Sequence, residues 1–236
     1  MGATGGAQPQ AGPGVMRALL PVRELNTVKR RLSSVLTDKE RQRLVLAMLG
    51  DVIRAGHGAG FVLDVLSADP DVLAFAAGLG ANPLREHVRQ KSLNAALEWA
   101  LSTRYIDESL VMVLLPDVPL VTSDELTTLV AAALVHSGPC VMAVPDRAAD
   151  GTNALICQPP WAIPMRFGPH SLRGHSKLAR ARGIHWDVCS LPGLAMDIDV
   201  EADLSEFLAR PSETDTYRLL TELGIPARFS QRAIRK

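Results

Sequence analysis

A run of six apolar residues, LVMVLL at 110–115, limits the fold of this chain more than any other feature. A strand that is apolar at every position buries both of its faces, which is typical of the centre of a parallel sheet covered by helices on both sides. The run ends in Pro116-Asp117-Val118-Pro119, where the prolines stop the strand and stiffen the loop. The sequence therefore predicts an α/β protein with this strand near the middle of its sheet.

Other apolar strands alternate with helical patterns along the chain. Two capping boxes, Thr37-Asp38-Lys39-Glu40 and Thr122-Ser123-Asp124-Glu125, mark helix starts. The alternation predicts a mainly parallel, doubly wound sheet with helices on both faces, in a single domain over 15–236. Residues 1–14, rich in Gly, Ala and Pro, are expected to be a disordered tail. Strands are expected over 15–22, 61–66, 110–115, 140–144 and 184–189, helices over 37–55, 69–78, 92–102, 122–136, 171–182, 200–209 and 213–223, a loop over 82–91, and an irregular stretch from 151 onward.

Charge and composition exclude several classes of protein. Lys plus Arg and Asp plus Glu both number 25, so the net charge is zero, and only 4% of residues are aromatic. Nucleic-acid binders usually carry a basic excess and stacking aromatics, so no nucleic-acid partner is expected. No apolar run approaches the length of a membrane helix, so no membrane partner is expected either. The cysteines are three and widely spaced, which favours reduced thiols in a cytoplasmic protein.

Polar residues cluster where the predicted strands end, and ligands of such sheets bind beyond the carboxyl ends of the strands. Arg23 and Lys29 follow the first strand and Asp117 follows the apolar run, while Asp197 and Asp199 precede a late helix. Residues two apart point the same way in extended backbone. The three carboxylates therefore suit a hard divalent cation such as Mg²⁺. A second interpretation makes Asp199 only the cap of the following helix, and the spacing leaves both open.

Three further clusters each allow a functional and a structural interpretation. Lys29-Arg30-Arg31 could neutralise phosphates, although the residue types alone favour a solvated helix face. Gly151-Thr152-Asn153 could hold an anion or a base edge, or form an ordinary turn. Phe167-Gly168-Pro169-His170-Ser171 could place a phosphate at a helix N-terminus, although Ser171 as a simple N-cap is favoured. The sequence contains no P-loop, no dinucleotide glycine motif, no G-x-S-x-G and no zincin spacing.

Together these clusters resemble a known family, the guanylyltransferases of coenzyme F-420 biosynthesis. Each piece is weak alone, but the ordered set over about residues 16 to 208 is specific. The matching segments are Pro21-Val22-Arg23-Glu24-Leu25 with Lys29-Arg30-Arg31-Leu32; Leu93-Asn94-Ala95-Ala96-Leu97; Asp117-Val118-Pro119-Leu120; Pro145-Asp146-Arg147 with Asp150-Gly151-Thr152-Asn153-Ala154-Leu155; and Phe167-Gly168-Pro169-His170-Ser171 with His175, Asp197-Ile198-Asp199 and Asp203-Leu204.

The resemblance implies a Rossmann-like nucleotidyltransferase fold and the joining of GTP to a phosphorylated three-carbon acid, with release of pyrophosphate. The acid would be 2-phospho-L-lactate, phosphoenolpyruvate or 3-phospho-D-glycerate. A homodimer and a downstream transferase that accepts the product are also implied. The residue roles that the resemblance implies are Asp117, Asp197 and Asp199 for Mg²⁺; Lys29 and Arg31 with Asp117 for catalysis; Lys29, Arg31, Asn94 and Pro116 for the nucleotide; and Arg23, Thr152, Gly168 and Ser171 for the acid.

One position departs from the family pattern, because Arg23 stands where relatives usually carry Lys. Arg is a planar fork and Lys a compact charge, so the preferred acid is expected to be sensitive to this position.

Two alternatives stay open. A nucleotidyltransferase of the molybdenum-cofactor or sugar-phosphate type usually opens with a glycine-rich loop that is missing here, and a non-catalytic nucleotide-binding module would not need the intact aspartates.

Overall fold

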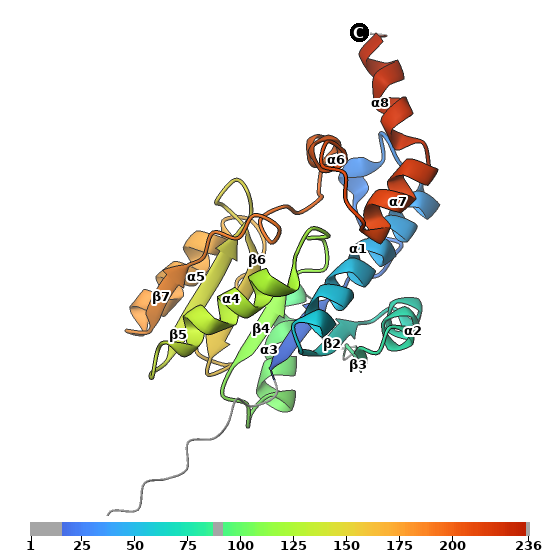
Figure 1. The fold of residues 1–236 in the computed structure, drawn as a ribbon. Coiled ribbons are helices and arrows are strands. Elements are labelled where there is room, and N and C mark those ends of the chain that lie inside the picture. The colour runs from blue at the N-terminus through green and yellow to red at the C-terminus, as the bar shows by residue number, and fades with distance from the viewer. Residues whose placement is uncertain (1–15, 87–91, 235–236) are drawn as a thin grey trace, which may run out of the picture.

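The computed structural model describes residues 16–86 and 92–234, and its centre is a seven-stranded sheet in the order β3-β2-β1-β4-β6-β5-β7 (Figure 1). The predicted apolar run forms the middle of this sheet as β4, with all of its residues buried. The predicted α/β class is therefore confirmed. The strands are β1 Arg17–Pro21, β2 Val62–Ser67, β3 Asn82–Arg85, β4 Val111–Leu114, β5 Cys140–Pro145, β6 Thr152–Gln158 and β7 His185–Val188.

The direction of β6 decides which residues reach the functional edge of the sheet. Among the described strands β6 alone runs antiparallel to its neighbours, pairing with β4 on one side and β5 on the other. Ala154 pairs with Leu114 at the carboxyl end of β4, and Thr152 pairs with Pro145 at the end of β5. The beginning of β6 therefore lies at the same edge as the ends of its neighbours.

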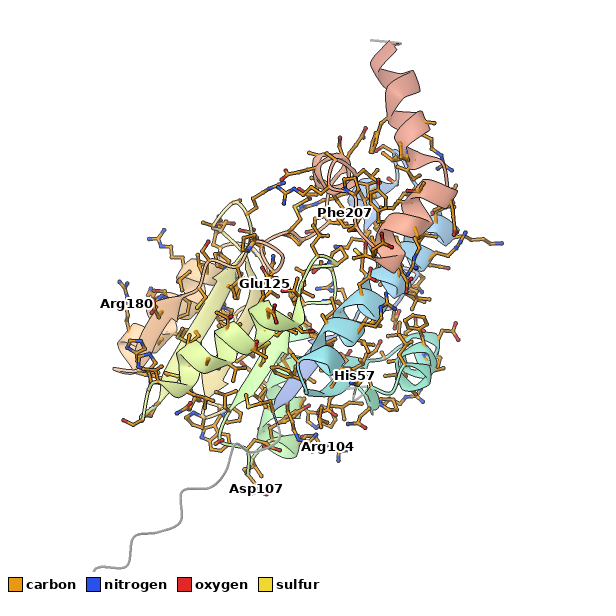
Figure 2. The ribbon with its side chains drawn as sticks, viewed as in Figure 1. His57, Arg104, Asp107, Glu125, Arg180 and Phe207 are labelled. Atoms are coloured by element: carbon orange, nitrogen blue, oxygen red, sulfur yellow. The ribbon has the colours of Figure 1, made fainter. Side chains whose placement is uncertain are left out.

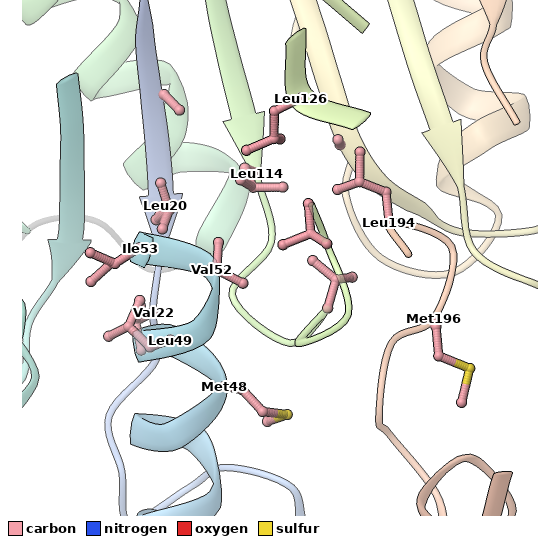
Figure 3. Packing of buried hydrophobic residues seen from close by; sticks show 14 of the residues in the cluster. Leu20, Val22, Met48, Leu49, Val52, Ile53, Leu114, Leu126, Leu194 and Met196 are labelled. Carbon is pink, nitrogen blue, oxygen red and sulfur yellow. The ribbon is translucent and has the colours of Figure 1, made fainter. Parts of the chain in front are cut away.

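Helices cover both faces of the sheet, as predicted, and form two separate cores. Alternate residues of each strand supply them, because side chains in a strand point to opposite faces. Leu20 and Leu114 pack against α1 and α4, as Figure 3 shows, whereas Leu19 and Val113 pack against α3 and α5. The helices are α1 Asp38–Gly58, α2 Pro70–Gly78, α3 Leu93–Arg104, α4 Ser123–Leu134, α5 Ser171–Ala181, α6 Glu201–Leu208, α7 Asp215–Glu222 and α8 Ile225–Ile234, with a 3-10 turn at Arg30–Leu32.

The two predicted capping boxes open α1 and α4. In α1 the Thr37 hydroxyl accepts from the Glu40 N–H, and the Glu40 carboxylate accepts from the Thr37 N–H at 2.8 Å. Near the other end of α1, Gly56 lets the helix lie close to the sheet. A Cβ atom at position 56 would stand 2.8 Å from a methyl carbon of Leu63 on β2, so any larger residue would force the Leu63 side chain or the helix to shift.

A buried carboxylate fixes the C-terminal helices on α1. Both oxygens of Asp51 accept hydrogen bonds from the start of α7, namely from the N–H groups of Asp215 and Thr216 and from the Thr216 hydroxyl. Arg54 forms an ion pair with the same carboxylate. A second link joins Arg228 of α8 to Glu40 at 2.6 Å. These contacts hold α7 and α8 beside α1, away from the sheet (Figure 1).

Three predictions about local structure are wrong. The predicted loop over 82–91 begins with strand β3, a short and mostly exposed edge strand that contains Pro83 and lacks an apolar pattern; residues 87–91 lie outside the described residues. The stretch from 151 is strand β6, whose run Ala154–Cys157 is buried between β4 and β5. Helix α8 was also not predicted, because Gly224 and Pro226 at its start are typical of a chain that has left a helix.

The predicted tail, residues 1–14, lies outside the described residues. Within the described part of the chain, no helix is both long enough and apolar enough to cross a membrane.

Candidate active site

The segment after β7 brings the late aspartates to the end of β4. The Ile198 N–H donates to the backbone carbonyl of Asp117 at 3.1 Å, so the two segments run side by side. Further back, the capping-box carboxylate of Glu125, labelled in Figure 2, also accepts from the Gly193 N–H at 2.6 Å. The Asn153 amide donates to the Leu194 carbonyl at 2.9 Å. Contacts with α4 and β6 therefore place Asp197 and Asp199 beside Asp117.

Lys29 stands between two of the three predicted aspartates. Its ammonium nitrogen is 2.7 Å from Oδ2 of Asp117 and 2.5 Å from Oδ1 of Asp199. Only 9% of its side chain is exposed. Burial opposes the charge, but Asp117 and Asp199 outweigh it and raise the pKa of Lys29 above its usual value. Lys29 also has a left-handed backbone (φ 48°), which non-glycine residues seldom adopt. The fold thus holds a permanent cation at this point.

The third aspartate, Asp197, has a raised pKa. Burial, followed by the neighbouring charges of Asp117 and Asp199, raises the pKa of Asp197 to about 6, although an amide hydrogen bond from Asn153 at 3.2 Å opposes the rise. Burial would raise the pKa of Asp199 too, but Lys29 and Arg31 hold it below its usual value. The three predicted carboxylates therefore lie near one another, and the pKa values of Asp197 and Asp199 shift in opposite directions.

The helix-cap interpretation of Asp199 is wrong. Helix α6 begins after Val200, and the carboxylate of Asp203 accepts from the N–H groups of both Asp199 and Val200, at 3.0 and 2.9 Å. Because Asp203 supplies this cap from within the helix, the carboxylate of Asp199 is available to contact Lys29.

One oxygen of the cluster lacks a partner. Within the described residues, Oδ1 of Asp117 is buried and accepts no hydrogen bond, while Oδ2 is paired with Lys29. An unsatisfied buried carboxylate oxygen beside two other carboxylates is a donor set that suits a hard cation. As the side chains stand, no three Asp, Glu, His or Cys residues of the described chain form a group that could hold a metal ion. The donor chemistry fits a divalent ion, and the cation now among the carboxylates is Lys29.

A cavity of about 360 Å³ opens over this cluster. Its volume lies within the range of small-ligand sites. The wall combines basic and acidic groups, which suits a polyphosphate that arrives with a counter-cation. The predicted residues in the wall are Arg23, Lys29, Arg31, Pro116, Asp117 and Asp199.

Three of the four predicted acid-binding residues, Thr152, Gly168 and Ser171, lie around the start of α5, whereas Arg23 lies in the wall of the cavity. Thr152 and Ser171 are buried, and Ser171 is the first residue of the helix. The Leu172 N–H donates to the Asp150 carbonyl at 3.1 Å, which packs this helix end onto the turn before β6. Gly168 takes φ 117°, a conformation that favours glycine and bends the chain into the helix. This group is joined to the aspartates through Asn153, which follows Thr152 and reaches Asp197.

Asn94 makes two hydrogen bonds to the backbone of Phe167. Its amide nitrogen donates to the carbonyl of Phe167 at 3.0 Å, and its oxygen accepts from the Phe167 N–H at 2.8 Å. These two bonds fix the loop that leads into Gly168. The role of Asn94 at the nucleotide stays a prediction. In the structure Asn94 contacts the loop before Gly168, which leads to the predicted acid-binding residues Gly168 and Ser171.

His175 lies beside Thr152 on this side of the site, and no role was predicted for it from the sequence. Its ring is buried between Thr152 and the backbone of Arg166. Burial, followed by the charge of Arg166, lowers the pKa of His175 to about 4. Two signals in the sequence pointed to it: its place in a segment that matches the family, and its position four residues after Ser171, which puts both on one face of the helix.

The lowered pKa of His175 predicts a dependence of stability on pH. Below pH 6.5, the ordinary pKa of histidine, His175 of the unfolded chain binds a proton. In the folded chain His175 binds that proton only near pH 4. The stabilisation is complete above pH 6.5 and is lost as the pH falls toward 4, by about 3 kcal/mol. Urea unfolding of the wild type and of His175→Gln across this range should show their difference in free energy shrinking with acidity. Parallel curves would contradict the prediction.

Two solved structures share the fold of this chain. A putative nucleotide-diphospho-sugar transferase from Desulfovibrio desulfuricans superposes with a TM-score of 0.71 at 17% identity, covering 88% of this chain and 94% of that one. A nucleotidyl transferase from Methanothermobacter thermautotrophicus gives 0.61 at 13% identity, covering 83% and 96%. These similarities confirm the predicted Rossmann-like nucleotidyltransferase fold.

The family follows from the sequence comparison. Residues 16–236 match the family model "Guanylyl transferase CofC like", and the chain belongs to that family of guanylyltransferases. A phosphoenolpyruvate guanylyltransferase of Rubrobacter xylanophilus is 40% identical over 195 residues, 81% of this chain and 93% of the relative. One of Sphaerobacter thermophilus is 39% identical over 197 residues, 80% and 90%. A 2-phospho-L-lactate guanylyltransferase of Methanothermobacter thermautotrophicus is 33% identical over 219 residues, 91% and 95%. The resemblance stated from the motifs is confirmed.

Proposed function

We propose that this protein joins GTP to a phosphorylated three-carbon acid, releasing pyrophosphate, as a step of coenzyme F-420 biosynthesis. The observation that carries the proposal is the cluster of Lys29, Asp117 and Asp199 in the wall of the cavity at the carboxyl edge of the sheet. Among the possible acids we expect phosphoenolpyruvate to be preferred, because the two relatives near 40% identity carry that substrate in their names.

In the proposed reaction, a phosphate oxygen of the acid attacks the α-phosphorus of GTP. A bond forms between them while the bond from the α-phosphorus to the bridging oxygen breaks, and pyrophosphate leaves with that electron pair. No side-chain nucleophile is required, because the phosphate of the acid is largely ionised at neutral pH. The thiols fit this view, since burial raises the pKa of Cys157 to about 12 and also raises that of Cys140.

The main obstacle is repulsion between two anions, and the residues of the cavity are suited to reduce it. Lys29 and Arg31 would neutralise GTP phosphates, and Arg23 with the start of α5 would orient the acid. Asp117, Asp197 and Asp199 would hold Mg²⁺, which when bound supplies further charge neutralisation between the reacting phosphates. The unpartnered Oδ1 of Asp117 and the donor chemistry support this assignment.

The proposal is tested by pyrophosphate release from GTP and Mg²⁺ with phosphoenolpyruvate, 2-phospho-L-lactate or 3-phospho-D-glycerate, with ATP replacing GTP as the control. We expect release only when GTP and an acid are both present, fastest with phosphoenolpyruvate. GTP binding without release for any acid would instead favour a non-catalytic module. Release with a pterin or sugar phosphate alone would favour another nucleotidyltransferase.

We further propose that the protein is a cytoplasmic homodimer. We also propose that a downstream transferase accepts its product, because an acid activated as a phosphoanhydride is expected to be labile. The three cysteines are free thiols, which supports a reducing compartment. Sedimentation of the purified protein measures the oligomeric state, and the transferase should consume the product in a coupled assay.

A further inference from the structure

His175 links Thr152 to the loop before Gly168, two parts of the region where the acid is proposed to bind. Its side chain is fully buried on α5. Nδ1 of the ring is 3.2 Å from the Thr152 hydroxyl, and Nε2 accepts from the Arg166 N–H at 3.0 Å. The edge of the ring also packs against Phe167, with ring centres 5.0 Å apart. The imidazole therefore contacts β6 and the loop before Gly168 at the same time.

The loop before Gly168 depends on acceptors of this kind. Each backbone N–H from Met165 to Phe167 donates to a side chain, at 3.2 Å to Glu98, 3.0 Å to His175 and 2.8 Å to Asn94. A backbone N–H can only donate, so the Nε2 atom that receives it carries no proton. A neutral imidazole carries one proton. The proton of His175 therefore lies on Nδ1, and Nδ1 donates to the Thr152 hydroxyl.

Because Nδ1 donates, the Thr152 hydroxyl is the acceptor in its hydrogen bond with His175. Its oxygen accepts from His175, so its own O–H is directed elsewhere. In the part of the chain that the structure describes, the bond to His175 is the one hydrogen bond of this hydroxyl. With the opposite tautomer, the hydroxyl would donate to the ring and turn lone pairs toward an incoming anion, and the Arg166 N–H would lose its acceptor.

We propose that His175 is a positioning residue that directs the Thr152 hydroxyl to donate to an anionic oxygen of the phosphorylated acid. This inference rests on the proposed function for the identity of that anion. A neutral ring adds no charge to the site, and the contribution of His175 is to fix the direction of one hydrogen bond and the position of the loop that leads to Gly168 and Ser171.

Two substitutions separate the roles. In His175→Gln the amide oxygen can take the place of Nε2 and accept from Arg166, but nothing donates to Thr152. Thr152→Val removes the hydroxyl and keeps the shape. We expect each change to raise KM for the acid about 10-fold, leave KM for GTP within about twofold, and give no further loss when combined, because both remove the same hydrogen bond. His185→Gln, an exposed position on β7, is the matched control.

Effects that multiply in the double variant, or an equal rise in KM for GTP, would overturn the proposal. If His175→Gln does not fold, His175→Asn replaces it: its amide nitrogen can donate to Thr152 from the place of Nδ1, while the Arg166 N–H loses its acceptor. A rise in KM for the acid smaller than that of Thr152→Val is then expected, and an equal or larger rise would overturn the proposal.

A second measurement needs no activity. The ¹⁵N shifts of the His175 ring in the unliganded wild type, assigned by their loss in His175→Gln, report which nitrogen carries the proton. A proton on Nδ1 is expected, and a proton on Nε2 or a charged ring at neutral pH would overturn the inference. A wild type inactive with every acid would instead overturn the proposed function and, with it, the acid as the anion.

Discussion

Asp117→Asn is expected to fold normally and to release pyrophosphate at least ~100-fold more slowly than the wild type. The change keeps the shape of the side chain and removes its charge. Oδ2 contacts Lys29, and Oδ1 is buried without a hydrogen-bond partner, which leaves it free to contact a bound cation. The reaction would lose a group placed to hold Mg²⁺, while the cavity keeps its form.

Rates with GTP and phosphoenolpyruvate, together with circular dichroism and thermal melting, measure this effect. Asp107→Asn is the matched control, since Asp107, labelled in Figure 2, is exposed and precedes β4, whereas Asp117 follows the other end of that strand. The control should keep wild-type turnover. A folded Asp117→Asn variant with near-normal turnover would refute the role of Asp117, and Asp117→Ala should reproduce the loss.

Lys29→Met is expected to lower kcat/KM for GTP by about 100-fold. Lys29 is the group that separates Asp117 from Asp199, and its removal leaves two carboxylates facing each other and a weaker attraction for GTP phosphates. Stability should fall as well, by about 1–3 kcal/mol, because a partly buried ion pair loses one partner. Asp199, which is half exposed, keeps some hydration and moderates this loss.

The same variant tests the fit of the carboxylates to a divalent ion without any turnover. If the three aspartates hold Mg²⁺, the ion should raise the melting temperature of Lys29→Met more than that of the wild type, because it replaces the missing charge. Lys39→Met, at an exposed site on α1, is the control and should behave like the wild type. An active Lys29→Met enzyme would contradict the prediction for Lys29, and a melting temperature unaffected by Mg²⁺ would contradict the metal assignment.

The sequence was most informative where a local pattern has a single structural outcome. The apolar run at 110–115 became the central strand, and both capping boxes opened helices as predicted. The loop clusters at the strand ends did meet at one edge, since parallel strands end on the same side. The prediction failed at β3, which has little apolar signal, and at β6, whose buried run follows a turn and precedes several prolines.

The sequence by itself determined the class of fold, the edge of the sheet where polar groups collect, and the family, because these follow from periodicity and ordered motifs. Only the tertiary structure decided how those groups pair. Lys29 and Asp199 lie 170 positions apart in the chain, and Asn94 reaches Phe167 across 73. The tautomer of His175 likewise depends on a backbone N–H nine positions away. Such pairings depend on how helices and strands pack, and no local pattern specifies them.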